Sequence, residues 1–336
     1  MARRTAASSY DEGDVRVRPG RGSRPRSKLR PAHANATSAL VIAVDRGRYT
    51  CVLDGRTVTA MTARELGRKA VVVGDRVGLV GDVSGAPGSL ARIVRVESRS
   101  TVLRRTADDD DPVERVIVAN ADQLMIVTAV ADPEPRPRLI DRALVAAFDA
   151  GIEPLLCLTK ADLADPGPLL ATYAPLHVPA VVTRLAPGSD ADVGDVERHL
   201  RDRVTVLVGH SGVGKSTLVN VLVPGADRAV GQVNVVTGRG RHTSTSAVAL
   251  PLPDGGWVID TPGIRSFGLA HVDPDRLILA FPDLAAETEE CPRGCTHADG
   301  EPECGLDAAL AAGRVDPDRL ASYRRLLASR DRQAGD

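Results

Sequence analysis

The chain has 336 residues, which is long enough for two or three domains that each bury a core. Its formal net charge of −1 excludes a uniformly basic nucleic-acid-binding coat, and its aromatic content of 2% means that the cores must consist mainly of Val, Leu, Ile and Ala. There is no apolar run of about 18 residues for a membrane span. The N-terminal segment also lacks the apolar stretch of a secretory signal, so we expect a cytoplasmic protein that does not enter a membrane.

The first segment, residues 1–37, is rich in Arg, Gly, Ser and Pro and has no apolar periodicity. This composition predicts a disordered basic arm that contacts RNA phosphates through its arginines. The alternative is a solvated tail that binds nothing specific.

Residues 38–98 contain five short β-rich runs separated by turns with Gly and Asp, which predicts a small barrel such as the OB fold. OB barrels often bind nucleic acid, but Tyr49 stands almost alone here as an aromatic residue for base stacking. The predicted strands are Ala39–Val44, Tyr49–Leu53, Thr57–Met61, Val77–Val80 and Ala91–Val96.

Residues 99–270 change to an α/β pattern. Gln123–Val130 is a continuous apolar run, as expected for a strand covered on both faces, and Pro137–Ala150 has helical spacing. Polar motifs follow the next predicted strands, at the edge where open parallel sheets bind ligands. Those strands are Leu155–Leu158, Val204–Val208 and Trp257–Ile259.

The first polar motif, Thr159-Lys160-Ala161-Asp162, resembles the guanine-reading motif of GTPases, which is usually Asn-Lys-x-Asp. Asp162 would accept two hydrogen bonds from N1–H and the 2-amino group of guanine, whereas adenine would leave the carboxylate unsatisfied. Lys160 would lie along the base plane. Thr159 replaces the usual Asn, which is expected to weaken base anchoring. The alternative is an Asp that caps a helix.

The second motif, Gly209–Ser216, matches G-x-x-x-x-G-K-[ST] between an apolar strand and an apolar helix. Glycines let backbone N–H groups face the phosphates, Lys215 places its charge on the β and γ oxygens during catalysis, and Ser216 ligates Mg²⁺. The expected nucleotide contacts here are Gly209, His210, Ser211, Gly212, Val213, Gly214, Lys215, Ser216 and Thr217, with no specific role for the His210 side chain.

The third motif, Asp260-Thr-Pro-Gly263, would hold Mg²⁺ through Asp260 and meet the γ-phosphate through the N–H of Gly263. The preceding Gly/Arg-rich stretch, residues 237–245, predicts a switch whose Thr243 or Thr245 reaches Mg²⁺, or alternatively an ordinary flexible loop. Many GTPases carry a water-orienting Gln where this chain has Ile264, so His242 is the catalytic candidate. Its alternative is a solvent-exposed loop histidine.

The final segment, residues 271–336, carries Cys291, Cys295, His297 and Cys304, which suits a tetrahedral Cys₃His zinc site in a reducing compartment. Free loop cysteines are the alternative. A terminal helix is predicted from Asp316-Pro317. Clustered arginines are expected to contact the phosphates of a nucleic acid; they are Arg239, Arg241, Arg319, Arg324, Arg325 and Arg330.

The order of motifs is reversed relative to an ordinary GTPase, because the base motif precedes the phosphate loop, as in a circularly permuted GTPase. With the switch and the Cys/His cluster, this order is similar to the RsgA (YjeQ) family over residues 38–330. The resemblance implies an α/β P-loop GTPase domain (circularly permuted) at 99–270, an N-terminal OB-fold β-barrel and a C-terminal zinc-binding α-helical domain. One departure is Cys291-x3-Cys295, where the family usually has four intervening residues.

The same resemblance implies a monomeric GTPase that binds the 30S ribosomal subunit and its 16S rRNA during late maturation, is stimulated by the subunit and leaves after hydrolysis. It implies GTP/GDP, Mg²⁺ and one structural Zn²⁺. It also favours His242 as the water-orienting group. Two alternatives are an ATP-using P-loop enzyme, such as a small-molecule kinase, and an RNA-binding module whose nucleotide is only structural.

Overall fold

The computed structural model describes residues 33–66, 71–105, 115–185, 192–226, 247–261, 269 and 272–331. Nearly all of the predicted basic arm lies outside these ranges. Within them, no helix is long and apolar enough to cross a membrane.

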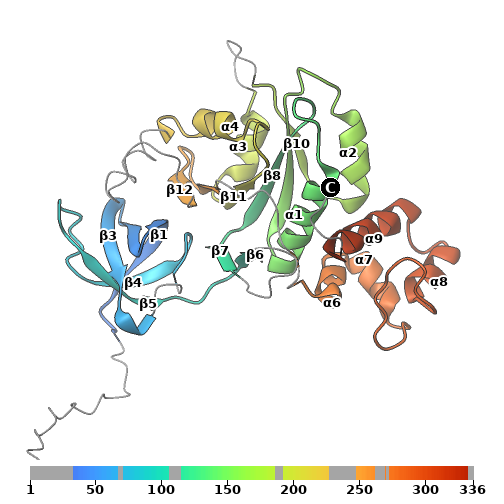
Figure 1. Ribbon diagram of the computed structural model, residues 1–336, viewed down its shortest axis with the longest axis horizontal. Coiled ribbons are helices and arrows are strands. Elements are labelled where there is room, and N and C mark those ends of the chain that lie inside the picture. Colours follow the sequence, from blue (N-terminus) through green and yellow to red (C-terminus); the bar gives the residue numbers. More distant parts are fainter. Residues whose placement is uncertain are drawn as a thin grey trace, which may run out of the picture. The chain divides into compact units, whose positions relative to one another are not determined.

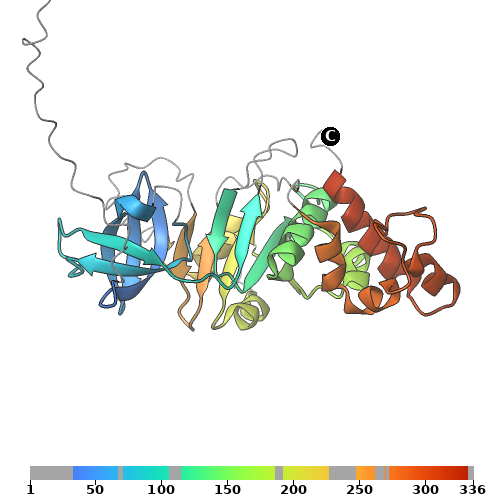
Figure 2. The same ribbon diagram turned by 90° about the horizontal axis from the view of Figure 1, so that it is seen from below.

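Five strands near the N-terminus form a closed barrel (Figure 2). β1 pairs with both β2 and β4, while β3 and β5 run parallel to each other and close the ring in the order β1-β2-β3-β5-β4. This confirms the predicted OB barrel. Its core consists of small and aliphatic side chains around Tyr49, as the low aromatic content requires. The strands are β1 (Thr37–Asp45), β2 (Arg48–Leu53), β3 (Arg56–Thr62), β4 (Arg76–Gly81) and β5 (Ala91–Val96), with a short 3₁₀ turn η2 (Arg64–Leu66).

A two-stranded hairpin that the sequence did not predict follows the barrel. β6 (Val102–Arg105) pairs antiparallel with β7 (Arg115–Ala119). The two strands are short and rich in arginine at their paired ends, so they lack the apolar alternation that identifies a strand from sequence.

The α/β part of the sheet has the order β10-β9-β8-β11-β13-β12, and five of its strands are parallel while β12 is antiparallel. β12 also pairs with β1, so the sheet continues into the barrel. Counted from the strand before the phosphate loop, β11, the spatial order is 6-5-4-1-3-2. The last three strands of that count come first in this chain, so the sheet itself is permuted. The strands are β8 (Gln123–Ala129), β9 (Glu153–Thr159), β10 (Ala180–Val182), β11 (Val204–Val208), β12 (Val248–Pro251) and β13 (Trp257–Asp260).

Helices cover both faces of this sheet, which explains its continuous apolar strands (Figure 1). In β8, Leu124 and Ile126 pack on the face covered by α1, whereas Met125 and Val127 pack on the face covered by α3 and α4. The helices are α1 (Pro137–Ala150), α2 (Gly167–Tyr173), α3 (Gly194–Leu200) and α4 (Lys215–Leu222), with the 3₁₀ turn η3 (Ala174–Leu176).

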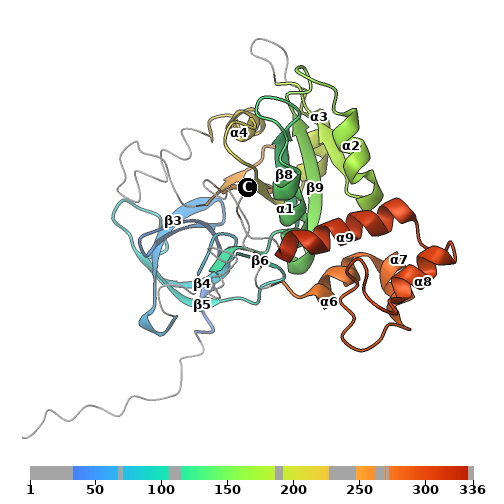
Figure 3. The same ribbon diagram turned by 45° about the vertical axis from the view of Figure 1, so that its right-hand side comes forward.

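Short helices at the C-terminus pack against α1, and α9 lies beside it (Figure 3). Phe281 stands edge-on between Phe148 of α1 and Tyr323 of α9, with ring centroids 5.3 Å apart in both pairs. The segment contains α6 (Pro274–Leu277), η4 (Ile278–Ala280), α7 (Pro282–Ala285), η5 (Ala286–Thr288), α8 (Gly305–Ala311) and α9 (Pro317–Asp331).

The arginines of α9 correct the expectation of a free basic patch. Arg319 is 7% exposed, donates to both carboxylate oxygens of Asp283 at 2.9 Å and donates to the carbonyl of Pro175 at 2.8 Å. Arg324 pairs with Asp307 at 2.8 Å, and Arg325 lies 3.3 Å from the buried Asp141 of α1. The phosphate-contact prediction is therefore wrong for Arg319, because its guanidinium fixes the C-terminal helices to η3, and the other two are engaged in similar pairs.

We expect Arg319→Leu to lower the free energy of unfolding by about 2–4 kcal/mol, because it leaves Asp283 and the Pro175 carbonyl without their donor. Chemical denaturation of the full chain measures this. The matched control is Arg314→Leu, which removes an exposed pair with Glu287 and should change stability by less than about 1 kcal/mol. Equal effects of the two variants would contradict the role given to Arg319.

The same pair has a defined pH dependence. The Arg319 guanidinium lowers the pKa of the Asp283 carboxyl through their hydrogen bonds. A carboxyl with a lowered folded-state pKa stabilises the fold above its unfolded pKa of about 3.9, and this contribution disappears as the pH falls through the folded value. The stability difference between the native chain and Arg319→Leu should therefore shrink only below about pH 4.

Candidate nucleotide site and metal centre

Three predicted motifs meet at one edge of the sheet. Thr159 ends β9, the phosphate loop follows β11, and Asp260 ends β13, so all three lie at the carboxyl ends of parallel strands. The register pairs Ala129 with Thr159 and Leu207 with Asp260, which brings the motifs together on neighbouring strands. This is the edge at which an open α/β sheet binds its ligand.

Two glycines of the phosphate loop stand at backbone positions that other residues would not fit. A Cβ on Gly209 would lie 2.4 Å from the carbonyl oxygen of Val127, so only glycine fits against β8. Gly214 has φ +86° and precedes the first residue of α4, Lys215. The Lys215 ammonium forms an ion pair with Asp260, which places the predicted phosphate and magnesium residues at one point.

The other loop residues divide by exposure. Ser211, Gly212, Ser216 and Thr217 are exposed, as nucleotide contacts require, while Val213 is buried. His210 is 7% exposed, and its Nδ1 lies 2.9 Å from the carbonyl of Ser211. Its side chain therefore faces the protein, and only its backbone is available to a phosphate.

Thr159 connects the base motif to the phosphate loop. Its side chain is 1% exposed, and its hydroxyl donates to the carbonyl of Val213 at 2.6 Å and lies 3.3 Å from the carbonyl of Thr128. The sequence suggested only that Thr in place of Asn weakens base anchoring. The geometry instead gives the hydroxyl a definite contact that holds β9 against the loop.

The remaining base-motif residues directly follow the end of β9. Asp162 is exposed just beyond β9, and the N–H of Ala161 donates to the carbonyl of Thr183 after β10 at 3.3 Å. Lys160 has φ +57°, and its ammonium donates to the carbonyl of Asp132 in the loop after β8. The Asp132 contact was not predicted, because nothing in the local pattern of that loop indicates it.

A second threonine that sequence reasoning missed supports the magnesium motif. Thr261 is 3% exposed, and its hydroxyl donates to the carbonyl of Leu207 at 2.6 Å. It ties the end of β13 to β11, directly beside Asp260. The predicted residues His242, Thr243 and Gly263 lie outside the described residues, as do Thr245 and Ile264.

We expect Thr159→Val to weaken GDP binding about 5- to 10-fold, because it leaves the buried Val213 carbonyl without a hydroxyl donor and loosens the loop. Fluorescence titration with a labelled GDP measures the affinity. Thr159→Ser keeps the hydroxyl and is the matched control, expected to stay within about twofold of the native chain. Native affinity in Thr159→Val would contradict this role.

The four predicted metal ligands form one cluster. Their ligand atoms all lie within 4.8 Å of one another, and His297 Nδ1 is 3.4, 3.7 and 3.8 Å from the sulfurs of Cys295, Cys291 and Cys304. A tetrahedral zinc ion with its usual bond lengths separates sulfur and nitrogen ligands by about 3.6 Å. The Cys₃His group fits one zinc ion, and the shorter spacing after Cys291 does not remove that residue from the cluster.

The surroundings of the cluster also suit a metal. The backbone N–H of Gly305 donates to the sulfur of Cys291 at 3.1 Å, and Arg324 donates to the carbonyl of His297 at 3.2 Å. Burial lowers the pKa of His297, which favours the neutral ring that binds metals. Burial raises the pKa of Cys295 to about 11, so metal binding has to displace a proton from that thiol.

The fold and the site together define a circularly permuted P-loop GTPase. Two solved structures share this architecture. The crystal structure of YjeQ from Thermotoga maritima matches with a TM-score of 0.62 and 26% identity over 88% of this chain and 99% of that one. YloQ, described as a circularly permuted GTPase, matches in fold with a TM-score of 0.61 at 22% identity, over 90% and 98% of the two chains.

Comparison of the sequence with known families narrows the class of protein further. The profile of the RsgA GTPase family matches residues 96–270. A small ribosomal subunit biogenesis GTPase RsgA from Chlorobaculum parvum is 37% identical over 82% of this chain and 90% of its own length, and one from Azotobacter vinelandii is 43% identical over 77% and 75%. The chain belongs to the RsgA GTPase family.

The relative from Pseudomonas aeruginosa strain LESB58 is 46% identical, but the match covers 63% of this chain and only 64% of that relative's length. Membership of the family implies GTP or GDP and Mg²⁺ as the ligands of the phosphate-loop edge. The residues at this edge fit a nucleotide with Mg²⁺. Lys215 and Asp260 form an ion pair there, and Ser216 is exposed beside them.

Proposed function

We propose that this chain is a GTP-hydrolysing assembly factor for the small ribosomal subunit. It would act in late maturation of the 30S subunit, bind 16S rRNA and leave after hydrolysis. The observation that carries the proposal is the meeting of the base motif, phosphate loop and Asp260 at one sheet edge in permuted order. The names of the relatives, which are small ribosomal subunit biogenesis GTPases, support the choice of partner.

Each residue at the edge has a proposed role. Lys215 neutralises the β and γ oxygens during hydrolysis, while Ser216 and Asp260 hold Mg²⁺. Asp162 accepts hydrogen bonds from the guanine base. Thr159 holds the base motif in position against the phosphate loop. Beyond the described residues, Thr243 would complete the magnesium shell and the N–H of Gly263 would contact the γ-phosphate.

His242 is the proposed water-orienting residue, since Ile264 cannot serve. His242→Ala should lower subunit-stimulated turnover about 100-fold without changing GTP affinity, because general acid–base or orienting groups typically contribute 10²–10⁴-fold. Full stimulated turnover in the variant, with normal GTP binding, would remove His242 from the mechanism.

We propose one role for each successive segment of the chain. We propose a basic arm at 1–37, an RNA-contacting barrel at 38–98, the GTPase at 99–270 and a zinc-binding unit at 271–336, acting as a cytoplasmic monomer away from membranes. The closed barrel and the Cys₃His cluster support the two flanking assignments.

A small-molecule kinase that uses ATP is the second candidate, because the phosphate loop alone does not select the base. A nucleotide titration with GDP and ADP decides between them. We expect preference for GDP, and Asp162→Asn should weaken GDP binding by at least about 100-fold, because the amide cannot accept hydrogen bonds from both N1–H and the 2-amino group of guanine. Equal affinity for ADP would favour the kinase.

A further inference from the structure

A cavity of about 460 Å³ opens at the edge of the sheet opposite the phosphate loop. Gln123 and Glu153, the first residues of β8 and β9, both line it. Because β9 spans seven residues, roughly 20 Å separate this edge from the base motif. The cavity is therefore separate from the GTP site, and its volume lies in the range of pockets that hold small molecules, about 300–1,000 Å³.

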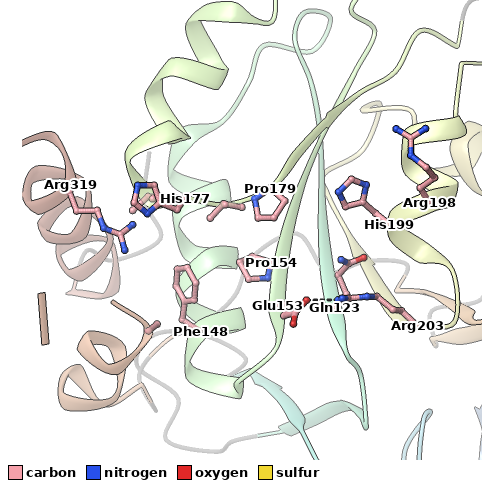
Figure 4. A pocket seen from close by; sticks show the side chains of 13 residues that line it. Gln123, Phe148, Glu153, Pro154, His177, Pro179, Arg198, His199, Arg203 and Arg319 are labelled. Atoms are coloured by element: carbon pink, nitrogen blue, oxygen red, sulfur yellow. Dashed lines mark hydrogen bonds and ion pairs between the residues drawn. The ribbon is translucent and has the colours of Figure 1, made fainter. Parts of the chain in front are cut away.

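One end of the cavity presents flat apolar surfaces. Phe148 lies at this end in Figure 4, on the same side as Arg319 and His177. Leu176, Pro179 and Ala280 are also in the lining. The Phe148 ring is held in place by its edge-on contact with Phe281. A planar ring can stack on such a surface, and base–aromatic stacking tolerates every base.

The other end is cationic. Arg198, His199 and Arg203 line this side in Figure 4, where the Arg203 guanidinium points toward Glu153 and the Arg198 guanidinium points away from it. Glu153 is the single acid in the lining. Arg203 pairs with Glu153, and Arg198 pairs with Asp195. All four side chains of these pairs are 40% exposed or more, so the pairs contribute little and can be exchanged for a stronger anion. Guanidinium groups suit phosphate because they donate two parallel hydrogen bonds.

A buried amide adds a polar donor between the two ends. Gln123 is 4% exposed, and its Oε1 accepts a hydrogen bond from the Thr205 hydroxyl at 3.3 Å. Its amide nitrogen is then oriented away from Thr205 as a donor in the lining. Arg319, which also lines the cavity, is held in place by its hydrogen bonds to Asp283 and to the Pro175 carbonyl.

We propose that this cavity is a second nucleotide-binding site, which takes one nucleoside 5′-phosphate, either free or as an unstacked nucleotide of single-stranded RNA. The base packs at the Phe148 end, and the phosphate replaces the Glu153 carboxylate that pairs with Arg203, while Arg198 adds positive charge on the same side. Since the lining includes Ala280 and Arg319 as well as β8 and β9, the ligand contacts the GTPase sheet and the C-terminal helices together.

The test uses the full chain with excess GDP and Mg²⁺, so that the phosphate-loop site is filled. Two probes are titrated at one fixed salt concentration: adenosine 5′-monophosphate and a labelled single-stranded hexaadenylate RNA. The cavity variant is Arg198→Gln with Arg203→Gln. The matched control, Arg201→Gln with Arg314→Gln, removes the same charge at exposed positions outside the cavity.

We expect the cavity variant to weaken binding of at least one probe about fivefold or more, while the control changes it by less than about twofold. If the cavity variant binds both probes more weakly, a mononucleotide is sufficient as the ligand. If it binds only the RNA more weakly, the ligand is a polymer. Both results support the proposal. Equal changes in the two variants, an unchanged cavity variant, or displacement of the probes by inorganic phosphate as well as by the nucleotide would overturn it. None of these results depends on GTP hydrolysis.

Discussion

Replacing Cys295 and Cys304 together by serine is expected to abolish zinc binding and to unfold the C-terminal helices. The cluster holds four ligands from a loop and the start of α8, and the loop itself contains little other structure. Structural zinc ions contribute on the order of 10 kcal/mol to the folding of small segments, which is comparable to the whole stability of a domain. Metal analysis should show one zinc ion in the native chain and none in the variant.

Limited proteolysis measures the structural consequence. Residues 272–331 should become susceptible in the variant, while the barrel strands stay protected, since their core is separate. The control is Cys157→Ala, which alters a fully buried cysteine of β9 outside the cluster and should keep its zinc. Full zinc content, or unchanged protection of 272–331 in the double variant, would refute the structural role of the cluster.

Lys215→Ala is expected to lower GTP hydrolysis at least about 100-fold and to weaken GTP binding, because it removes the charge directed at the β and γ oxygens. The structure places Lys215 at the phosphate-binding edge of the sheet, because it is the first residue of α4 and forms an ion pair with Asp260 there. Steady-state phosphate release and labelled-nucleotide titration measure the two effects.

Asn220→Ala, an exposed position further along α4, is the matched control and should retain native hydrolysis. Circular dichroism of both variants separates loss of function from unfolding. If Lys215→Ala folds normally and still hydrolyses GTP at the native rate, the catalytic site lies elsewhere.

The sequence predicted the regular elements well because their signals are local. Pro137–Ala150 was read as a helix from its apolar spacing, and α1 has the same bounds, with proline at its first turn. The strands of the barrel and the parallel strands before each motif were also correct within a few residues. In each case the period of the apolar residues, together with turn residues at the ends, was sufficient.

What the sequence did not reveal depends on contacts between distant residues. The Thr159 hydroxyl bonds to Val213, 54 positions along the chain, and a threonine at a strand end carries no signal of this. Arg319 lies in a polar helix, so its charge suggested an exposed surface, whereas the fold buries it against Asp283 and η3. β12 is not recognisable from the sequence because a strand of four residues shows no clear period, although it pairs with β13 on one side and β1 on the other.

These contacts also change the expected coupling between the nucleotide and the C-terminal helices. In the sequence, residues 264–269 lead from the Asp260–Gly263 motif directly into the C-terminal segment, which by itself suggests a coupling route there. The described contacts show another connection: α9 is attached to α1 through Arg325 with Asp141, and Phe281 packs on Phe148. Because α1 lies between β8 and β9, the C-terminal helices are joined to the strand that ends in the base motif.

We propose above all that this chain hydrolyses GTP as a switch on the small ribosomal subunit. GTP hydrolysis by the full chain with and without purified 30S subunits tests it most directly. We expect slow turnover by the chain alone and at least about tenfold faster turnover with the subunit, since a partner that completes a GTPase site can raise kcat by about 10³- to 10⁵-fold. Identical rates in the presence and absence of the subunit would contradict it.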